Sequence, residues 1–485
     1  MRTATMITAA ALLAWAVGCG GAAETTKPKT PGGHDAETPT PQVSAAVANK
    51  FNAGLEALVQ HDKAADWTDL TCVSTAQLFL DAAKEQGKTL NEATYNAGLA
   101  NQRCKKVEAA KALFKQVLDN DPKFHRAKVQ LAMYAYADSG EKNIDEAIAT
   151  IREAAVVDAQ FKNVEALVDL GMLYIKRNNK VEDQDGKTDL LRAKRFIQSA
   201  MALDDGYMPA FNQLAILYLE TAKQAAGRDT KRKVASGGSK EKKVDTQALE
   251  LAALVCSQAI RKNAKYASIH NTAGMIQVEL SNLNGAVSEF DTARTIEPSF
   301  YEAQMNYAAV NLQFRGFKQA EQAYRKAIEI RPNDYDAHLG LALALRGGTD
   351  DSNFDKNVKE ASDELAKAKQ LAPDRAETYY NEAILTQEYK AKSGKGGDAE
   401  LLNAKKLFGD FIAKASGAGE FGDAVKRSKE RMAEIDQIIE FNKQSEKDRK
   451  ASEADLKQKA AETEAKGEEP APAAEGEKKD EKKPE

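Results

Sequence analysis

The sequence predicts an all-α protein, a right-handed superhelical solenoid of stacked helix pairs that lies between a disordered tether and a disordered tail. Three observations predict this fold class. The 485 residues include only 7% aromatic residues and 12 prolines, which is lean for a β-sandwich or barrel. Alanine, lysine, glutamate and glutamine, all good helix formers, are abundant. The third observation is a recurring pattern of small, large and proline residues at helical spacing.

Residues 1–18 are predicted to be a lipoprotein signal peptide. The apolar run from Met6 to Val17 is too short to span a bilayer but has the length of a signal-peptide core. It ends in Ala16-Val17-Gly18-Cys19, which resembles the lipobox of bacterial lipoproteins, although that motif usually has Leu where Ala16 stands. The resemblance implies cleavage before Cys19 and acylation of its thiol and new amine. The alternative is an ordinary secretory signal followed by an incidental cysteine.

Residues 19–42 contain glycine, threonine, lysine and four prolines, and we expect a lipidated tether rather than a domain. Gly20 follows the cysteine, whereas enterobacterial lipoproteins that stay at the inner membrane have Asp there. The resemblance therefore implies an outer-membrane lipoprotein on the periplasmic side. No other stretch reaches 18 apolar residues.

A repeat runs through most of the chain. The pattern Ala-x3-large-x2-(Ala or Val)-x4-Pro occurs in the segments Ala110–Pro122, Ala286–Pro298, Ala320–Pro332 and Ala361–Pro373. A small residue lies upstream of each segment, and two successive steps between these anchors span 34 residues. This spacing resembles the tetratricopeptide repeat (TPR), a helix–turn–helix unit. With weaker copies, the anchors are Gly54, Gly98, Ala132, Gly171, Ala215, Gly274, Ala308, Ala342 and Ala383, which predicts about nine units across residues 43–416.

The pattern has a physical reason. A small anchor in the first helix lets the second helix approach closely, and the alanine stripe of the second helix packs between neighbours. Proline then ends the second helix. In the degenerate first unit we expect this stripe at Ala76, Leu80 and Ala83.

Beyond the repeats, a C-terminal helix is expected within residues 417–444. Residues 445–485 are rich in Lys, Glu, Ala and Pro and are expected to form a disordered tail. The largest insertion, residues 223–247, is basic. A solvated loop is favoured there over a contact with a polyanion or an acidic partner.

No arrangement of residues predicts catalysis. The histidines are scattered over different units, and no zinc-ligand spacing, nucleophile elbow or phosphate-binding loop occurs. We therefore expect no enzyme activity, no metal, no cofactor and no small-molecule substrate. The net charge of -4 also argues against binding nucleic acid through bulk charge.

Two cysteines fall at matching positions. Cys72 and Cys104 lie at corresponding turn edges of the first two units, and these edges lie side by side when units stack. In an oxidising periplasm this predicts a disulfide, worth about 3–4 kcal/mol by chain entropy. Two free thiols are the alternative. Cys256 occupies an aromatic-type packing position and is expected to be a buried apolar residue.

In the TPR family that the repeats resemble, the first helices line a concave face, so the resemblance implies a concave groove as the candidate binding site. Its inward positions are predicted to be Val129, Met133, Tyr136, Val168, Met172, Ile175, Ile216, Leu219, Met275, Val278, Met305, Leu312, Leu339 and Leu343. This apolar stripe suits an amphipathic or extended protein segment and lacks the Lys, Arg and Asn of modules that clamp a peptide carboxylate. Alternatively, tight curvature or a later helix around Ala424–Asn442 fills the groove.

The order of these features resembles one family. A lipobox, about nine repeats, an early cysteine pair and a Lys/Glu/Ala tail are similar to the TPR outer-membrane lipoproteins of the adventurous gliding-motility machinery of myxobacteria. The resemblance implies a membrane-anchored scaffold that binds other envelope proteins of a multiprotein complex. Two alternatives stay open: a lipoprotein that assembles a secretion or type IV pilus channel, and an adaptor for peptidoglycan hydrolases.

Overall fold

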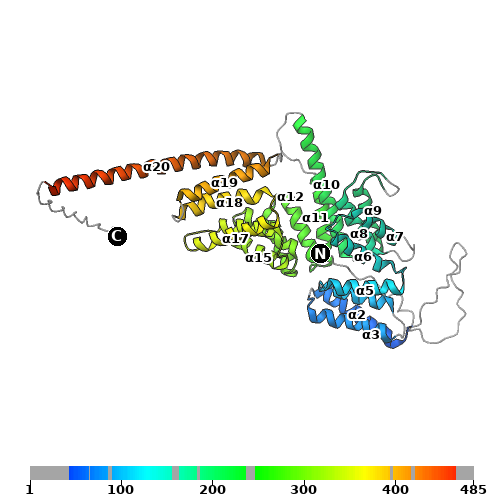
Figure 1. The fold of residues 1–485 in the computed structure, drawn as a ribbon. Helices are drawn as coiled ribbons and strands as arrows, with labels where there is room; N and C mark the ends of the chain where they lie inside the picture. Colours follow the sequence, from blue (N-terminus) through cyan, green and yellow to red (C-terminus); the bar gives the residue numbers. More distant parts are fainter. Residues whose placement is uncertain are drawn as a thin grey trace, which may run out of the picture. The chain divides into compact units, whose positions relative to one another are not determined.

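The computed structural model describes residues 43–64, 66–85, 90–155, 163–182, 186–235, 246–393, 397–416 and 421–465. The predicted signal peptide, Cys19 and the tether lie outside these residues. Throughout the described ranges the chain is helical and contains no strand, as the fold class requires (Figure 1). It divides into two compact units, an N-terminal unit ending at Phe314 and a C-terminal unit beginning at Arg315.

First and second helices alternate along the N-terminal unit. Its helices are α2 (Ala45–Ala64), α3 (Asp69–Glu85), α4 (Asn91–Arg103), α5 (Val107–Asn120), α6 (His125–Asp138), α7 (Ile144–Ala155), α8 (Val164–Arg177), α9 (Asp189–Leu203), α10 (Met208–Ala235), α11 (Thr246–Lys262), α12 (Ala267–Glu279), α13 (Leu283–Ile296) and α14 (Tyr301–Gln313).

The C-terminal unit continues the alternation. Its helices are α15 (Phe317–Ile330), α16 (Tyr335–Gly347), α17 (Phe354–Leu371), α18 (Ala376–Leu385), a π-helical turn (Thr386–Lys390), a 3-10 turn (Ala391–Ser393), α19 (Gly397–Ala415) and α20 (Gly422–Ala465). The nine predicted anchors fall on α2, α4, α6, α8, α10, α12, α14, α16 and α18. Among the described helices, none is both long and apolar enough to cross a membrane.

The predicted stripe of the second helices forms the core. From α5 to α19, every predicted stripe residue is buried, and most are fully buried. The triplets are Ala110/Phe114/Val117, Ala147/Ile151/Ala154, Ala193/Ile197/Ala200, Ala252/Cys256/Ala259, Ala286/Phe290/Ala293, Ala320/Tyr324/Ala327, Ala361/Leu365/Ala368 and Ala404/Phe408/Phe411. Burial raises the pKa of the Cys256 thiol to about 12, as expected for an apolar packing position.

Glycine anchors allow close approach of the paired helices. A Cβ on Gly98 would lie 2.6 Å from the ring of Phe114, and one on Gly274 would lie 2.5 Å from the ring of Phe290. Both distances are far below van der Waals contact, so a larger residue must displace the aromatic ring. The anchors are small because the second helix occupies the space a side chain would need.

The first pair departs from the predicted register. Phe79, not Leu80, is the fully buried large residue of α3, while Leu80 is only half-buried. The Phe79 ring sits against Gly54, 2.8 Å from the position of a Cβ there, and lies edge-on to Phe51 at 5.5 Å between centroids. Aromatic packing against the glycine anchor therefore outweighs the strict repeat spacing.

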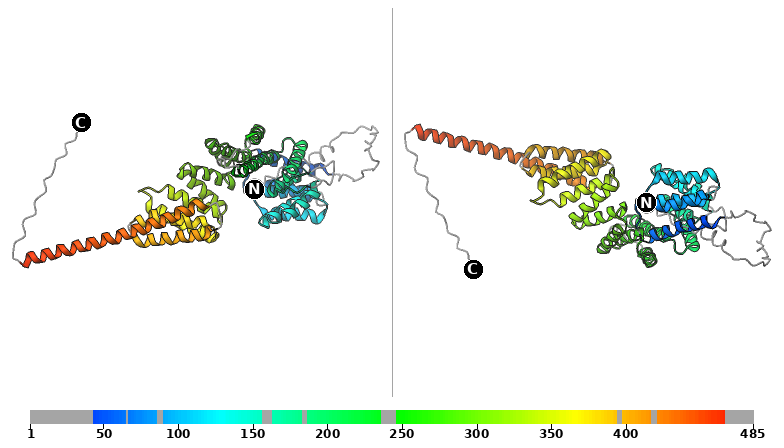
Figure 2. Two further views of the ribbon diagram at one scale, coloured as in Figure 1. Left: turned by 90° about the horizontal axis from the view of Figure 1, so that it is seen from above. Right: turned by 90° about the horizontal axis from the view of Figure 1, so that it is seen from below.

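Two helices extend past their expected ends. α10 continues to Ala235, into the segment expected to be a basic loop, where alanine, lysine and glutamine favour helix. α20 continues to Ala465 although we expected it to end near residue 444, and both views in Figure 2 show its distal part extending past α19. Ion pairs one helical turn apart support this part: Glu446–Lys450, Arg449–Glu453 and Asp455–Lys459.

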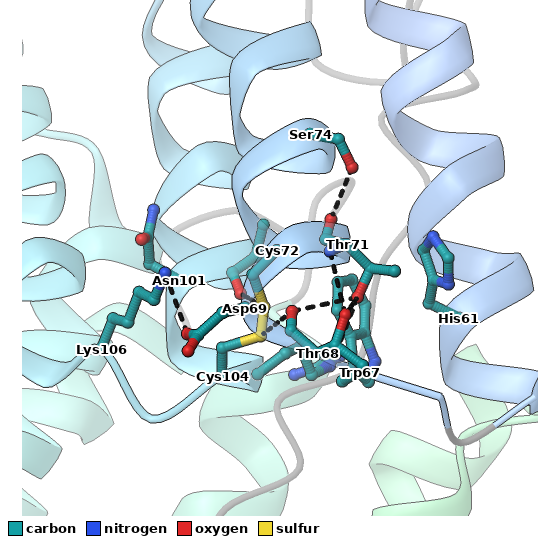
Figure 3. The surroundings of a disulfide bond; sticks show 12 residues. His61, Trp67, Thr68, Asp69, Thr71, Cys72, Ser74, Asn101, Cys104 and Lys106 are labelled. Carbon is teal, nitrogen blue, oxygen red and sulfur yellow. Dashed lines mark hydrogen bonds and ion pairs between the residues drawn. A yellow bond between two sulfur atoms is a disulfide. The ribbon is translucent and has the colours of Figure 1, made fainter.

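Cys72 and Cys104 form a disulfide between α3 and the α4–α5 turn, with 6.2 Å between their Cα atoms (Figure 3). Cys72 is fully buried. A second link joins the same elements, since Lys106 Nζ lies 3.1 Å from the Asp69 carboxylate. The first two helix pairs are thus joined by a covalent bond and by charge.

Histidines help to join successive pairs. His270 Nε2 donates to the carbonyl of Ala264 at 3.0 Å, and His338 Nε2 donates to the carbonyl of Pro332 at 2.9 Å. Burial lowers the pKa of His270, but its bonds to Glu289 and to the Ala264 carbonyl outweigh this and raise it overall. These histidines stabilise the turn before a first helix. In the described part of the chain, no cluster of three His, Cys, Asp or Glu residues could hold a metal.

Replacing Gly340 by alanine tests the close-approach rule. A Cβ at Gly340 of α16 would overlap the ring of Tyr324 on α15, so we expect Gly340→Ala to destabilise the protein by about 1–3 kcal/mol. Thermal melts followed by far-ultraviolet circular dichroism measure this change. Gly409→Ala is the control, because a Cβ there meets no atom within 4 Å and should stabilise α19 by about 0.5–1 kcal/mol. Equal melting of Gly340→Ala and wild type would contradict the rule.

Candidate functional site on the inner face of the first helices

The first helices lie on the inner side of each curved stack. In the N-terminal unit α6 contacts α8, α8 contacts α10, α10 contacts α12 and α12 contacts α14; in the C-terminal unit α16 contacts α18. Within the described ranges, the second helices are not in comparable contact with one another. The side with the closer helices has the smaller radius, so the first helices line the concave side. We call the residues three before, one after and four after each anchor the inner face.

The predicted groove residues divide into two groups. Five are buried and belong to the core of the N-terminal unit: Val129, Met133, Tyr136, Val168 and Leu219. Nine are half-buried: Met172, Ile175, Ile216, Met275, Val278, Met305, Leu312, Leu339 and Leu343. An open apolar groove along α6 is therefore a wrong expectation. Half-buried inner positions occur on α8, α10, α12 and α14 and, in the C-terminal unit, on α16.

Tight curvature at the N-terminal end explains the difference. Tyr95 of α4 donates a 2.5 Å hydrogen bond to Glu165 of α8, although α6 lies between these helices in the chain. Gln130 of α6 also donates to Glu165, at 3.3 Å, and all three side chains are buried. Burial and then the charge of Glu165 raise the pKa of Tyr95 well above its ordinary value, so the phenol stays protonated and donates. Here the solenoid fills its own inner face.

The inner face is more polar than the predicted stripe. Applying the same three offsets to every anchor adds eight aromatic or polar residues: Phe51, Tyr95, Gln102, Asn212, Asn271, Arg346, Tyr380 and Gln387. The spacing that located Val129 and Met275 also locates these residues. The prediction left out the polar ones of the mapped units and did not extend to the units of Gly54, Gly98 and Ala383. The sequence therefore contained the signal for a mixed inner face.

Five of these residues bond to the next first helix and so form a polar ladder. The ladder contacts are Gln102 Nε2 to Gln130 Oε1 (3.1 Å), Thr272 Oγ1 to Asn212 Oδ1 (2.7 Å), Asn306 Nδ2 to Asn271 Oδ1 (2.9 Å), Arg346 Nη1 to Asn381 Oδ1 (3.1 Å) and Arg431 Nη1 to Gln387 Oε1 (2.9 Å). Each contact pairs polar groups between neighbouring first helices, and the contact of Thr272 with Asn212 is buried. The ladder thus fixes the spacing of the first helices.

Arg346 is the unusual member of the ladder. Its guanidinium donates to the side-chain and main-chain oxygens of Asn381, and among the residues that the structure describes it forms no ion pair. Burial lowers the pKa of Arg346 and outweighs the opposite effect of nearby groups such as the Glu388 carboxylate, while the charge of Arg431 adds to the lowering. Arg431, in contrast, pairs with Glu388 at 2.7 Å. Glu388 thus pairs with Arg431, while Arg346 has no ion pair of its own in this described part of the C-terminal unit.

The α20 helix extends the same face. Ile435 and Ile439 are buried against Ile384 of α18 and Phe408 of α19, and Ser428 is fully buried. The first half of α20 therefore packs as the first helix of another pair would. It continues the stack in the C-terminal unit, and it brings Arg431 to the ladder.

A family model for the tetratricopeptide repeat matches residues 301–334. The chain contains a tetratricopeptide repeat. Similar solved structures include TTC0263 of Thermus thermophilus (23% identity over 46% of this chain and 99% of that one, TM-score 0.37), MamA of Desulfovibrio magneticus (17%, 40% and 96%, 0.30) and PilF of Pseudomonas aeruginosa (16%, 51% and 92%, 0.35). No curated protein matches the chain.

The tetratricopeptide repeat explains the alternation of first and second helices on either side of the matched residues. Such repeats form protein-binding scaffolds, since stacked pairs present a long continuous surface. The chain is accordingly a repeat protein whose fold serves protein–protein interaction. Its inner face is open to partners only where its residues are half-buried.

Methionines at equivalent positions test the two kinds of inner face. Met133 and Met275 both follow their anchor by one residue, but Met133 is fully buried and Met275 is half-buried. We expect Met133→Ala to destabilise the N-terminal unit by about 2–5 kcal/mol, because it leaves a cavity, and Met275→Ala to cost clearly less. Urea denaturation of the two variants measures this. If Met275→Ala costs as much as Met133→Ala, the difference in burial has no energetic meaning.

Proposed function

We propose that this chain is a lipid-anchored periplasmic scaffold that binds an acidic, extended segment of another envelope protein on the inner face of its C-terminal unit. The observation that supports the binding mode is Arg346, a half-buried guanidinium that, within the described part of the chain, donates to Asn381 and forms no ion pair. A partner carboxylate beside it would supply the ion pair that Arg346 lacks among the described residues, since nearby Glu388 pairs with Arg431. Hydrogen bonds between ionised groups are stronger than those between neutral groups. The guanidinium of arginine can donate two parallel hydrogen bonds to one carboxylate.

Apolar contacts would accompany this charge pairing. Leu339 and Leu343 lie on the same inner face of α16 and are half-buried. A partner segment with alternating acidic and apolar residues would place its acidic side chains beside Arg346 and its apolar side chains on the two leucines. Arg431 adds a second positive group, already paired with Glu388, at the edge of the site.

The membrane anchor and the identity of the complex belong to the same proposal. The lipobox-like residues at Cys19 favour an outer-membrane lipoprotein on the periplasmic side. The order of tether, repeats, cysteine pair and charged tail favours the gliding-motility machinery. Assembly of a secretion or pilus channel and recruitment of peptidoglycan hydrolases are the alternatives. Cross-linking in cells followed by identification of the co-purified proteins distinguishes these three functions, because each requires a different set of protein partners.

Binding of an acidic peptide tests the site. We expect a fluorescein-labelled peptide of alternating glutamate and leucine to bind the full chain, and Arg346→Gln to weaken binding about tenfold or more through loss of a charged hydrogen bond. Fluorescence anisotropy measures the affinity. Arg427→Ala is the matched control, because Arg427 is exposed on α20 and bonds only to the main chain of Asp423. Equal binding of the glutamine–leucine analogue would contradict recognition of charge.

Replacing Cys19 tests the anchor. We expect Cys19→Ala to abolish labelling by radioactive fatty acid and to move the protein from the membrane fraction to the periplasmic fraction, because acyl chains supply about 0.8 kcal/mol per buried methylene group. Cys256→Ala, which removes a buried thiol of the N-terminal unit, is the control and should keep the label. Fatty-acid labelling that survives in Cys19→Ala would refute the anchor.

A further inference from the structure

Two turns that are 194 residues apart in sequence meet within the N-terminal unit. Lys105, in the α4–α5 turn, donates from Nζ to Ser299 Oγ at 2.5 Å and to the Ser299 carbonyl at 3.2 Å. Its ammonium also lies 3.8 Å from the Glu297 carboxylate, in the α13–α14 turn. Among the residues that the structure describes, the Lys105 ammonium has no other partner, and all of these contacts lie in one turn.

The kinds of turn involved show what this contact means. The α4–α5 turn connects the two helices of one pair, whereas the α13–α14 turn connects successive pairs. In a solenoid these two kinds of turn lie on opposite edges of the stack. Opposite edges meet only when the superhelix has gone round once and the next superhelical turn lies against the first. The contact therefore closes one superhelical turn of the N-terminal unit.

The residues on both sides of Lys105 fix the α4–α5 turn to the first helix pair. Arg103 makes two hydrogen bonds to Asp62 of α2, at 2.8 and 3.0 Å. Cys104 is disulfide-bonded to Cys72, as Figure 3 shows, and Lys106 pairs with Asp69 of α3.

Lys105 itself has a left-handed backbone, with φ of 61°. Ser281 and Arg315 have the same conformation at their turns between first and second helices, so the repeat imposes it. The neighbours hold the turn toward the first pair, while the Lys105 side chain reaches the α13–α14 turn.

We propose that Lys105, Glu297 and Ser299 form a seam that closes the N-terminal unit, and that the Cys72–Cys104 disulfide keeps this seam closed. The Lys105 and Glu297 side chains are about one-third exposed, so their attraction is screened and weak alone. The Lys105–Glu297 attraction can therefore keep the two turns together only while the α4–α5 turn is held in position. The disulfide supplies that restraint, and the seam opens when the restraint is lost.

The Cys72–Cys104 disulfide is lost by thiol–disulfide exchange. A dithiol reductant attacks Cys104, which is half-buried, whereas Cys72 is fully buried. The sulfur–sulfur bond breaks, two electrons and two protons pass to the protein, and the reductant becomes a disulfide. The products are free thiols at Cys72 and Cys104. The α4–α5 turn can then move away from the α13–α14 turn and give a partner access to the inner side.

Hydrogen exchange of the full chain, followed by mass spectrometry, tests the seam. The amide of Phe300 donates to the carbonyl of Glu297 at 2.9 Å and so reports on the α13–α14 turn. We expect exchange across residues 297–300 to be about threefold to tenfold faster in Lys105→Ala, and likewise in a Cys72→Ser/Cys104→Ser variant. Lys115→Ala, at an exposed lysine of α5, is the control and should exchange like wild type.

A charge swap keeps the test decisive if a variant is generally unstable. Lys105→Glu alone should accelerate exchange of residues 297–300, because it places two negative charges together. Adding Glu297→Lys should restore protection. A variant that was merely unfolded would not be rescued by the second substitution. The seam is refuted if residues 297–300 exchange equally in wild type and Lys105→Ala. Control by the disulfide is refuted if the cysteine variant exchanges faster only within α2–α5 and leaves residues 297–300 unchanged.

Discussion

The fold depends on one steric constraint, the close approach of the first and second helix of each pair. Gly98 and Gly274 leave room for the rings of Phe114 and Phe290, which are buried between helices. On the other side of each ring the second helix presents alanines, so the next pair also packs closely. Dense packing of this kind tolerates little change in volume. The anchors therefore determine the helix spacing, and the spacing determines the curvature of each unit.

Curvature in turn decides what the inner face can do. Between α4 and α8, Tyr95 and Gln130 reach Glu165 and the inner face becomes core. On α16 the inner residues are half-buried, and Arg346 has no ion pair among the described residues. The same repeat thus yields a filled interior at one end of the chain and a candidate binding surface nearer the other. A polar ladder between first helices runs through both, because a purely apolar stripe would not specify which helix pairs with which.

Much of this architecture was predictable because it is local. The offsets within each unit located the stripe from Ala110 to Phe411 and the nine anchors, and the edge positions of Cys72 and Cys104 predicted their disulfide. Three features were not predictable from spacing. Phe79 took the place of Leu80 because its ring fits Gly54, a contact between helices. The burial of Met133 depends on curvature summed over several pairs. The contact of Lys105 with Ser299 joins turns whose proximity no local pattern encodes.

The ends of a solenoid have only one neighbour, and each end of this chain is stabilised in its own way. At the N-terminal end the first pair is degenerate, and a disulfide, the Asp62–Arg103 pair and the Asp69–Lys106 pair compensate for its weaker core. At the C-terminal end α20 covers α18 and α19 with Ile435 and Ile439, while its distal part relies on ion pairs worth about 0.3–0.5 kcal/mol each. Covalent restraint is therefore placed where the repeat is least regular and where a seam must be held. The C-terminal unit is covered by α20 through apolar packing and ion pairs, without a covalent cross-link among the described residues.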